Sequence, residues 1–178
     1  FPIDCRFGNG SEEFAHTNEA DAWRRYWPSG LTRPPARWTY SDGYKHMCRF
    51  FSMRWFLYLT RYAFVVRLDE DIVVRAWDVD PFEWMATSRL VYAYSVIIPE
   101  AHEETVLTMG AWLRDKRANV TDVSSMFFTN VFASDPSWWH RQSDVRAWLA
   151  CIERSRHIYT HRWGDAPIQT HVIRTYAP

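Results

Sequence analysis

Three consecutive carboxylates, Asp69-Glu70-Asp71, are the residues of this sequence whose types and spacing best suit chemistry. They follow an apolar, β-branched run that begins at Ala63, a pattern typical of a buried strand rather than a helix. Because a buried carboxylate without a partner is costly, the three must be solvated, paired or bound to a cation. Hard cations such as Mg²⁺ and Mn²⁺ prefer oxygen ligands and often share them with substrate phosphates. The pattern therefore indicates either a divalent-metal site or a solvated acidic turn.

The elements around this cluster alternate between strand and helix patterns, which predicts an α/β fold. The expected helices cover residues 19–26, 43–60, 80–85, 103–116, 135–154 and 166–173, and the expected strands cover 63–74, 91–98, 124–132 and 158–160. Ligands of open α/β sheets bind just outside the carboxyl ends of the strands. We therefore predict that Asp69 and Asp71 lie at the carboxyl end of a central strand, with their side chains facing a cleft.

The composition narrows the class of protein. The chain has 178 residues, enough for one domain with a proper core, and its formal net charge of zero argues against a nucleic-acid partner. No apolar run is long enough to span a bilayer, and the three cysteines form no CxxC pair that would indicate zinc. Since Phe1 is not an initiator Met, we expect a fragment or a processed form, whose membrane anchor, if one exists, lies outside this sequence.

Four stretches, in order, resemble the signature segments of one family. They are YKHMCRF at 44–50, RLDED at 67–71, MFFTN at 126–130 and HRWGDAP at 161–167. The family is glycosyltransferase family 15, the fungal α-1,2-mannosyltransferases of the Golgi. The weaker segments 80–85 and 91–96 agree, so the similarity covers roughly residues 38–173 of a single domain, with 1–37 as a loop-rich lead-in.

The resemblance implies a GT-A-like fold, in which helices flank a mixed sheet, and a location in the Golgi lumen. It implies a retaining transfer of mannose from GDP-mannose to a mannose hydroxyl of a glycan, with Mn²⁺ as cofactor. The implied metal ligands are Asp69, Asp71, Gln169 and His171. The implied substrate contacts are Arg49, His46, Tyr94, Arg162 and Trp163, and the implied catalytic residues are Asp135, Asp165 and Asn130.

Several of these residues keep a structural alternative. Arg49 could bind phosphate or form a buried ion pair that holds its helix to the sheet. Trp163 could stack on an acceptor sugar or pack beneath the Gly164 turn. Asp165 could accept the proton of an acceptor hydroxyl or serve only as a helix cap. Asn130 could bind sugar hydroxyls or satisfy the end of a strand.

The sequence also departs from the family pattern at functional positions. Gln169 stands where the family has a metal-binding His, and a Gln carbonyl oxygen can ligate a hard cation without adding charge. Phe132 stands where the family has a Glu proposed as nucleophile, and Asp135 is the next carboxylate. The segment before Tyr44 is too short for the usual strand–helix–strand that holds the nucleotide base, so we expect a fold truncated at its N-terminus. A catalytically degenerate member that binds a sugar nucleotide or glycan without transfer is therefore the alternative.

Overall fold

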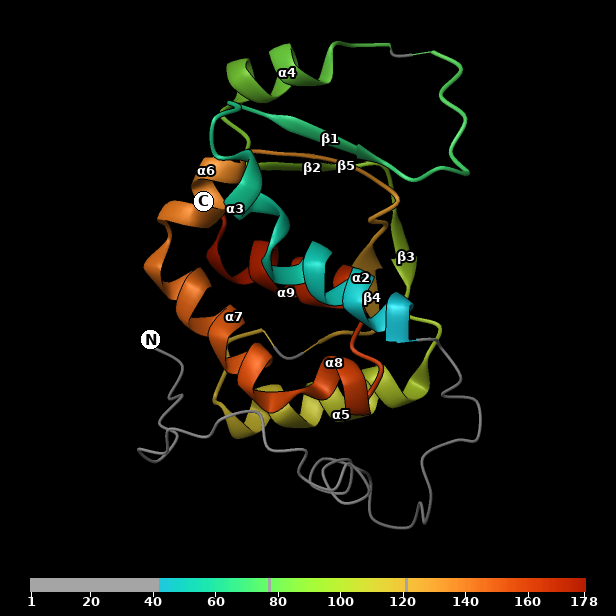
Figure 1. Ribbon diagram of the computed structural model, residues 1–178, viewed down its shortest axis with the longest axis vertical. Helices are drawn as coiled ribbons and strands as arrows, with labels where there is room; N and C mark the ends of the chain where they lie inside the picture. Colours follow the sequence, from blue (N-terminus) through green and yellow to red (C-terminus); the bar gives the residue numbers. More distant parts are fainter. Residues whose placement is uncertain (1–41, 77, 121) are drawn as a thin grey trace.

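The computed structural model describes residues 42–76, 78–120 and 122–178, and the expected helix at 19–26 lies outside them (Figure 1). The helices are α2 (Asp42–Met53), α3 (Trp55–Leu59), α4 (Pro81–Ser88), α5 (Glu103–Asp115), α6 (Pro136–Arg141), α7 (Ser143–Ser155), α8 (His157–Thr160) and α9 (Asp165–Tyr176). The strands are β1 (Val65–Leu68), β2 (Tyr92–Tyr94), β3 (Ile97–Pro99), β4 (Ser125–Phe127) and β5 (Val131–Ser134). The α/β class is confirmed.

The strands form two small sheets. The first has the order β1-β5-β2, with β5 antiparallel to both neighbours, and the second pairs β3 with β4, also antiparallel. Among the described residues β1 therefore lies at an edge of its sheet, so the prediction that the acidic cluster follows a central strand is wrong. The ends of β1 and β2 and the start of β5 nevertheless meet at one side of the sheet, because the register pairs Leu68 with Val131 and Tyr94 with Phe132.

Helices cover the three-stranded sheet. In Figure 1, α4 lies on one side of it and α9 and α2 on the other, with α5, α7 and α8 in a further layer beyond them. The core between these layers is rich in tryptophan, since Trp112, Trp139, Trp148 and Trp163 are all fully buried. Their indole rings pack edge-to-face or stack on neighbouring aromatic rings, which adds directional contacts to the hydrophobic burial. None of the described helices is both long and apolar enough to cross a bilayer.

Helix α9 is buried almost all round, which marks it as the central helix of the domain. Each residue from Asp165 to Val172 is buried, including four polar or charged side chains. Buried polar groups must be hydrogen-bonded, so the partners of these side chains largely define the architecture near the helix. The segment that resembles the family most specifically thus runs directly into the most enclosed element of the structure.

Several expected elements differ from those observed. The helix expected at 43–60 breaks at Arg54 into α2 and α3, and the strand expected at 124–132 breaks at a turn into β4 and β5. The strand expected at 63–74 ends at Leu68, because the amide of Ile72 bonds the carbonyl of Asp69 and closes a turn. The strand expected at 158–160 is wrong, since those residues form α8, whose turn closes with a His161-to-His157 bond. Tertiary packing here overrides the β-branched local preference.

Candidate functional site

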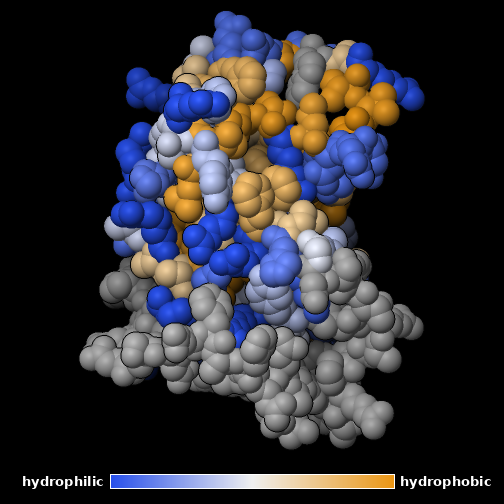
Figure 2. Space-filling model, viewed as in Figure 1, coloured by the Kyte–Doolittle hydropathy of each residue, from blue (hydrophilic) through white to orange (hydrophobic). Residues whose placement is uncertain are grey.

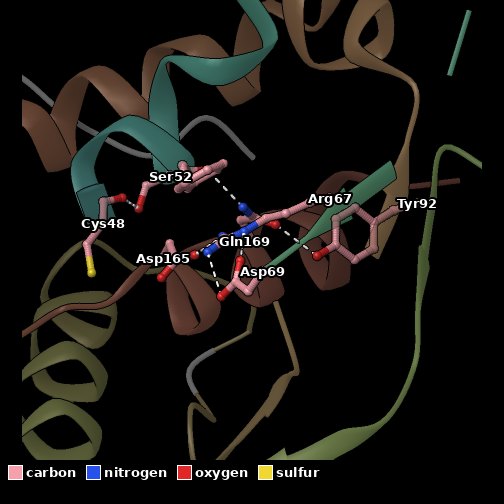
Figure 3. Close-up of polar contacts among 8 residues, drawn as sticks. Cys48, Ser52, Arg67, Asp69, Tyr92, Asp165 and Gln169 are labelled. Carbon is pink, nitrogen blue, oxygen red and sulfur yellow. Dashed lines mark hydrogen bonds and ion pairs between the residues drawn. The ribbon is translucent and has the colours of Figure 1, made fainter. Parts of the chain in front are cut away.

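The guanidinium of Arg67 joins two of the four family-like segments of the chain, RLDED and HRWGDAP (Figure 3). Its Nε donates to Asp69 at 2.7 Å, and its Nη1 donates to Asp165, the Asp of the RWGDAP run, at 2.6 Å. The side chains of Arg67 and Asp165 are only 10% and 9% exposed, whereas that of Asp69 is 27% exposed. The ring of Phe51 lies against the guanidinium, with its centroid 3.7 Å from Cζ. Residues from β1, α2 and α9 therefore converge on one buried cation.

This arrangement places the RWGDAP segment beside the acidic end of β1. Burial disfavours the charged form of Arg67, but the nearby carboxylates of Asp165 and Asp69 outweigh it and raise the pKa of Arg67 above its ordinary value. The guanidinium is therefore a permanent charge. It is also the residue that the sequence analysis missed, although an arginine inside an apolar strand is a signal, because buried arginines need partners.

The acidic cluster itself lies on a turn. The amide of Asp69 donates to the carbonyl of Asn130 at 3.0 Å, which extends the β1–β5 ladder by one bond. Glu70 and Asp71 follow on the exposed turn that Ile72 closes. Asp69 and Asn130 are thus neighbours, whereas Asp71 lies further out on the surface.

A second polar pair lies beside Arg67 in the core. The hydroxyl of Tyr92, on β2, donates to the side-chain oxygen of Gln169 at 2.8 Å, and the Gln169 nitrogen donates to the carbonyl of Phe51 at 2.8 Å. Burial, together with the charge of Asp165, raises the pKa of Tyr92 well above its usual value, so the phenol stays a donor. Gln169 is fully buried and satisfied, and its role in the free protein is to join α9 to β2 and α2.

The thiol of Cys48 lies in the same region. Burial, together with the negative charge of Asp165, raises the pKa of Cys48 to about 11. Cys48 is therefore a neutral thiol at physiological pH. Such a thiol is a poor nucleophile, so Cys48 acts as a packing residue beside Asp165.

The residues expected to bind Mn²⁺ do not fit a metal ion in this arrangement. Asp69 is bound to Arg67, the Gln169 oxygen accepts from Tyr92, and Asp71 lies on the exposed turn. His171 is two residues beyond Gln169, which places it on the opposite face of α9, where its ring stacks on Trp148 at 4.5 Å. Within the described ranges, no three His, Cys, Asp or Glu side chains cluster as metal ligands would. The metal site thus stays a prediction that these residues do not support.

His171 instead predicts a pH dependence of stability. Burial lowers the pKa of His171 from 6.5 to about 4, so the unfolded state binds this proton more readily than the folded state does. The contribution of the neutral imidazole is therefore present above pH 6.5 and is lost as the pH falls toward 4, with a total of about 3 kcal/mol. We expect urea unfolding between pH 7 and 4 to show this decline in wild type and a shallower one in His171→Gln. Parallel curves for the two proteins would contradict the assignment.

The expected substrate contacts are dispersed. Arg49 bonds Glu153 of α7 at 2.7 Å, and His46 bonds the Tyr159 hydroxyl of α8 at 2.9 Å, so both join α2 to other helices rather than facing the acidic turn. Arg49 thus forms an ion pair, as in its structural alternative, but the pair is part-buried and joins α2 to a helix instead of to the sheet. Trp163 is fully buried, with its Nε1 donating to Thr108 at 3.0 Å, and so packs in the core.

The other expected contacts differ in exposure. Arg162 is buried and lies 3.6 Å from Glu100. Tyr94 is 43% exposed at the end of β2, on the same side of the sheet as the acidic turn, and its ring stacks on Phe127 with centroids 4.1 Å apart. Among these residues, Tyr94 therefore has the position best suited to contact a ligand.

The side chains of Asp135 and Phe132 both make structural contacts, one as a helix cap and the other in the core. Asp135 follows β5 at the end that pairs with Val65, so it lies at the opposite end of the ladder from Asp69, about 17 Å away along the strand. It caps α6 by accepting from the amide of Trp138 at 3.0 Å. Phe132 is 3% exposed and packs between the rings of Tyr92 and Trp55.

Comparison with known proteins agrees with this fold. No family model matches the chain. The chain is 24% identical over 162 residues to glycolipid 2-alpha-mannosyltransferase 1 of Candida albicans, and 22% identical over 161 residues to the O-glycoside alpha-1,2-mannosyltransferase omh1 of Schizosaccharomyces pombe. These matches cover 78% and 76% of this chain but 37% and 40% of the relatives, so the chain spans about two-fifths of their length.

Solved structures of mannosyltransferases also resemble this chain. The mannosyltransferase Ktr4p of Saccharomyces cerevisiae in complex with GDP superposes with a TM-score of 0.64 at 19% identity, covering 76% of this chain and 42% of that one. Core-mannan synthase A of Aspergillus fumigatus, in an Mn/GDP form, gives 0.55 at 21% identity, covering 75% and 44%. The chain therefore has a GT-A-like fold. Its resemblance to the fungal mannosyltransferases, and to the α-1,2-mannosyltransferases among them, is confirmed.

Proposed function

We propose that this protein is a glycosyltransferase that moves mannose from GDP-mannose to a mannose hydroxyl of a glycan in the Golgi lumen. The observation that carries the proposal is the Arg67 bridge, which brings Asp165 of the RWGDAP run to the acidic end of β1. Similarity to named mannosyltransferases and to a GDP-bound structure supports this class of donor. The family-like segments thus meet in space in the way that a shared active site requires.

The side chains at this site suit a sugar acceptor. Asp165 uses Oδ2 to accept from Arg67, so Oδ1 is the oxygen that would take the proton of an acceptor hydroxyl. The exposed ring of Tyr94, whose one face is already stacked on Phe127, offers an aromatic edge to a sugar. Asn130, beside Asp69, would supply hydrogen bonds to sugar hydroxyls.

A transfer assay tests the proposal. The protein is incubated with GDP-mannose that carries a radiolabelled mannose, with α-methyl mannoside as acceptor, and the disaccharide product is separated and counted. Parallel reactions with and without added Mn²⁺ measure metal dependence separately. We expect labelled disaccharide above the level of a heat-denatured control, and an α-1,2 linkage by NMR would show that the donor's configuration is retained. The absence of product with every nucleotide sugar offered would overturn transfer as the function.

A second candidate function, binding without transfer, is favoured by Phe132. Its phenyl ring occupies a core position where the family carries a Glu, and no nucleophilic atom is available from it. The register places Phe132 directly across from Arg67 on β1, so Phe132→Glu would set a carboxylate opposite the guanidinium. If wild type binds GDP by calorimetry without transfer, we expect Phe132→Glu to gain some transfer. Phe132→Gln, which has the same shape without the charge, is the matched control and should gain none.

A further inference from the structure

The guanidinium of Arg67 lies between two carboxylates and bridges them. Its guanidinium is bonded to a carboxylate from β1 on one side and to a carboxylate from α9 on the other, with the face of Phe51 against it. Both contacts are charge-assisted, and the planar guanidinium matches carboxylate oxygens better than a point charge does. Asp69 accepts a second bond, from Nη2 at 3.3 Å, which occupies its other oxygen as well.

We infer that Arg67 is a positioning residue that acts as an internal counter-cation, and that by holding Asp69 it keeps the affinity of this site for divalent cations low. A divalent ion at Asp69 would have to displace two hydrogen bonds and would lie beside a fixed positive charge. The next polar oxygen, that of Gln169, is already committed to Tyr92.

The inference rests on the proposed function, because that function places the charged sugar-nucleotide donor at this site. Its test contains no donor and needs no turnover. Purified protein is titrated into MnCl₂ at pH 7, and free Mn²⁺ is measured by the intensity of its electron paramagnetic resonance signal. We expect wild type to bind with a dissociation constant of about 1 mM or weaker. Arg67→Gln, which removes the charge, is expected to bind at least about tenfold more tightly.

Three further variants separate the role of the charge from a structural effect. Arg67→Lys keeps the positive charge and should remain as weak as wild type. Arg141→Gln removes an arginine from the exposed pair with Asp135, 3.7 Å long, and should also leave Mn²⁺ binding unchanged. Asp69→Asn combined with Arg67→Gln should abolish the gain, because the carboxylate released by the first change is then missing.

Micromolar Mn²⁺ binding by wild type that Asp69→Asn abolishes would overturn the inference. So would an Arg67→Gln protein that is folded by circular dichroism and binds no more tightly than Arg141→Gln. If Arg67→Gln does not fold, wild type and Asp69→Asn are compared instead, and clearly tighter Mn²⁺ binding by wild type would overturn the inference. Mn²⁺ binding and mannose transfer are measured in separate experiments. The inference about Arg67 can therefore fail while the proposed function holds, and the reverse is also possible.

Discussion

Replacing Asp165 with Asn is expected to lower the rate of mannose transfer by at least about a hundredfold, the usual contribution of a catalytic base. The change removes the carboxylate that would accept the acceptor's proton but keeps the shape of the side chain. An Asn oxygen can still accept from the Arg67 guanidinium, which now bonds Asp165 at 2.6 Å, so the fold should survive. Initial rates of label transfer at saturating GDP-mannose measure the effect, and circular dichroism verifies the fold.

Asp135→Asn is the matched control for this experiment. Asp135 caps α6 at the far end of the β1–β5 ladder, and Asn is an equally good N-cap residue. We therefore expect its transfer rate to stay within about threefold of wild type, since removing a group far from the reacting atoms leaves the barrier nearly unchanged. A loss of several orders of magnitude in Asp135→Asn, with Asp165→Asn nearly normal, would reverse the assignment and make Asp135 the nucleophile.

The largest expected loss of stability comes from Arg67→Met, at about 3–5 kcal/mol of the free energy of unfolding. The substitution leaves the carboxylate of Asp165, whose side chain is 9% exposed, without its partner in the core. The thioether still packs against Phe51, so the effect reports mainly the lost charge. Urea denaturation at pH 7 measures it.

Arg141→Met provides the comparison, because it also removes an arginine that pairs with an aspartate. Here the guanidinium side chain is 67% exposed, and exposed ion pairs contribute about 0–1 kcal/mol. Equal losses in the two variants would show that the Arg67 bridge is as weak as a surface pair. The stabilising role given to it would then be wrong.

The prediction of local structure succeeded where one signal dominated. Asp80-Pro81 begins α4 as expected, with the Asp80 carboxylate accepting from the amide of Phe82 at 2.8 Å, because a cap residue followed by proline is unambiguous. Helix α5 begins at the predicted residue. The prediction failed where packing competes with propensity, as at Ile158-Tyr159-Thr160, a β-branched and aromatic run that folds as α8 between two other helices.

In the candidate site, too, some residues could be predicted from the sequence and others could not. The sequence alone pointed to Asp69 and Asp165 as candidate site residues, through motif resemblance and the cost of burying carboxylates. It did not identify Arg67, whose role depends on two partners that lie 2 and 98 positions away along the chain. Nor could it show that His171 faces Trp148 while Gln169 faces Tyr92, because that depends on how α9 is rotated about its axis within the core.

What the sequence by itself determined is therefore the class of fold, the acidic turn after β1 and the likeness to fungal mannosyltransferases, since these follow from local pattern and motif order. The tertiary structure alone decided which charges pair. It placed Asp135 at the remote end of the sheet, buried Trp163 and Phe132 in the core, and set Arg67 between two carboxylates. The physical reason is that an ion pair depends on distances of a few ångströms between elements far apart in sequence, and only the packed core sets those distances.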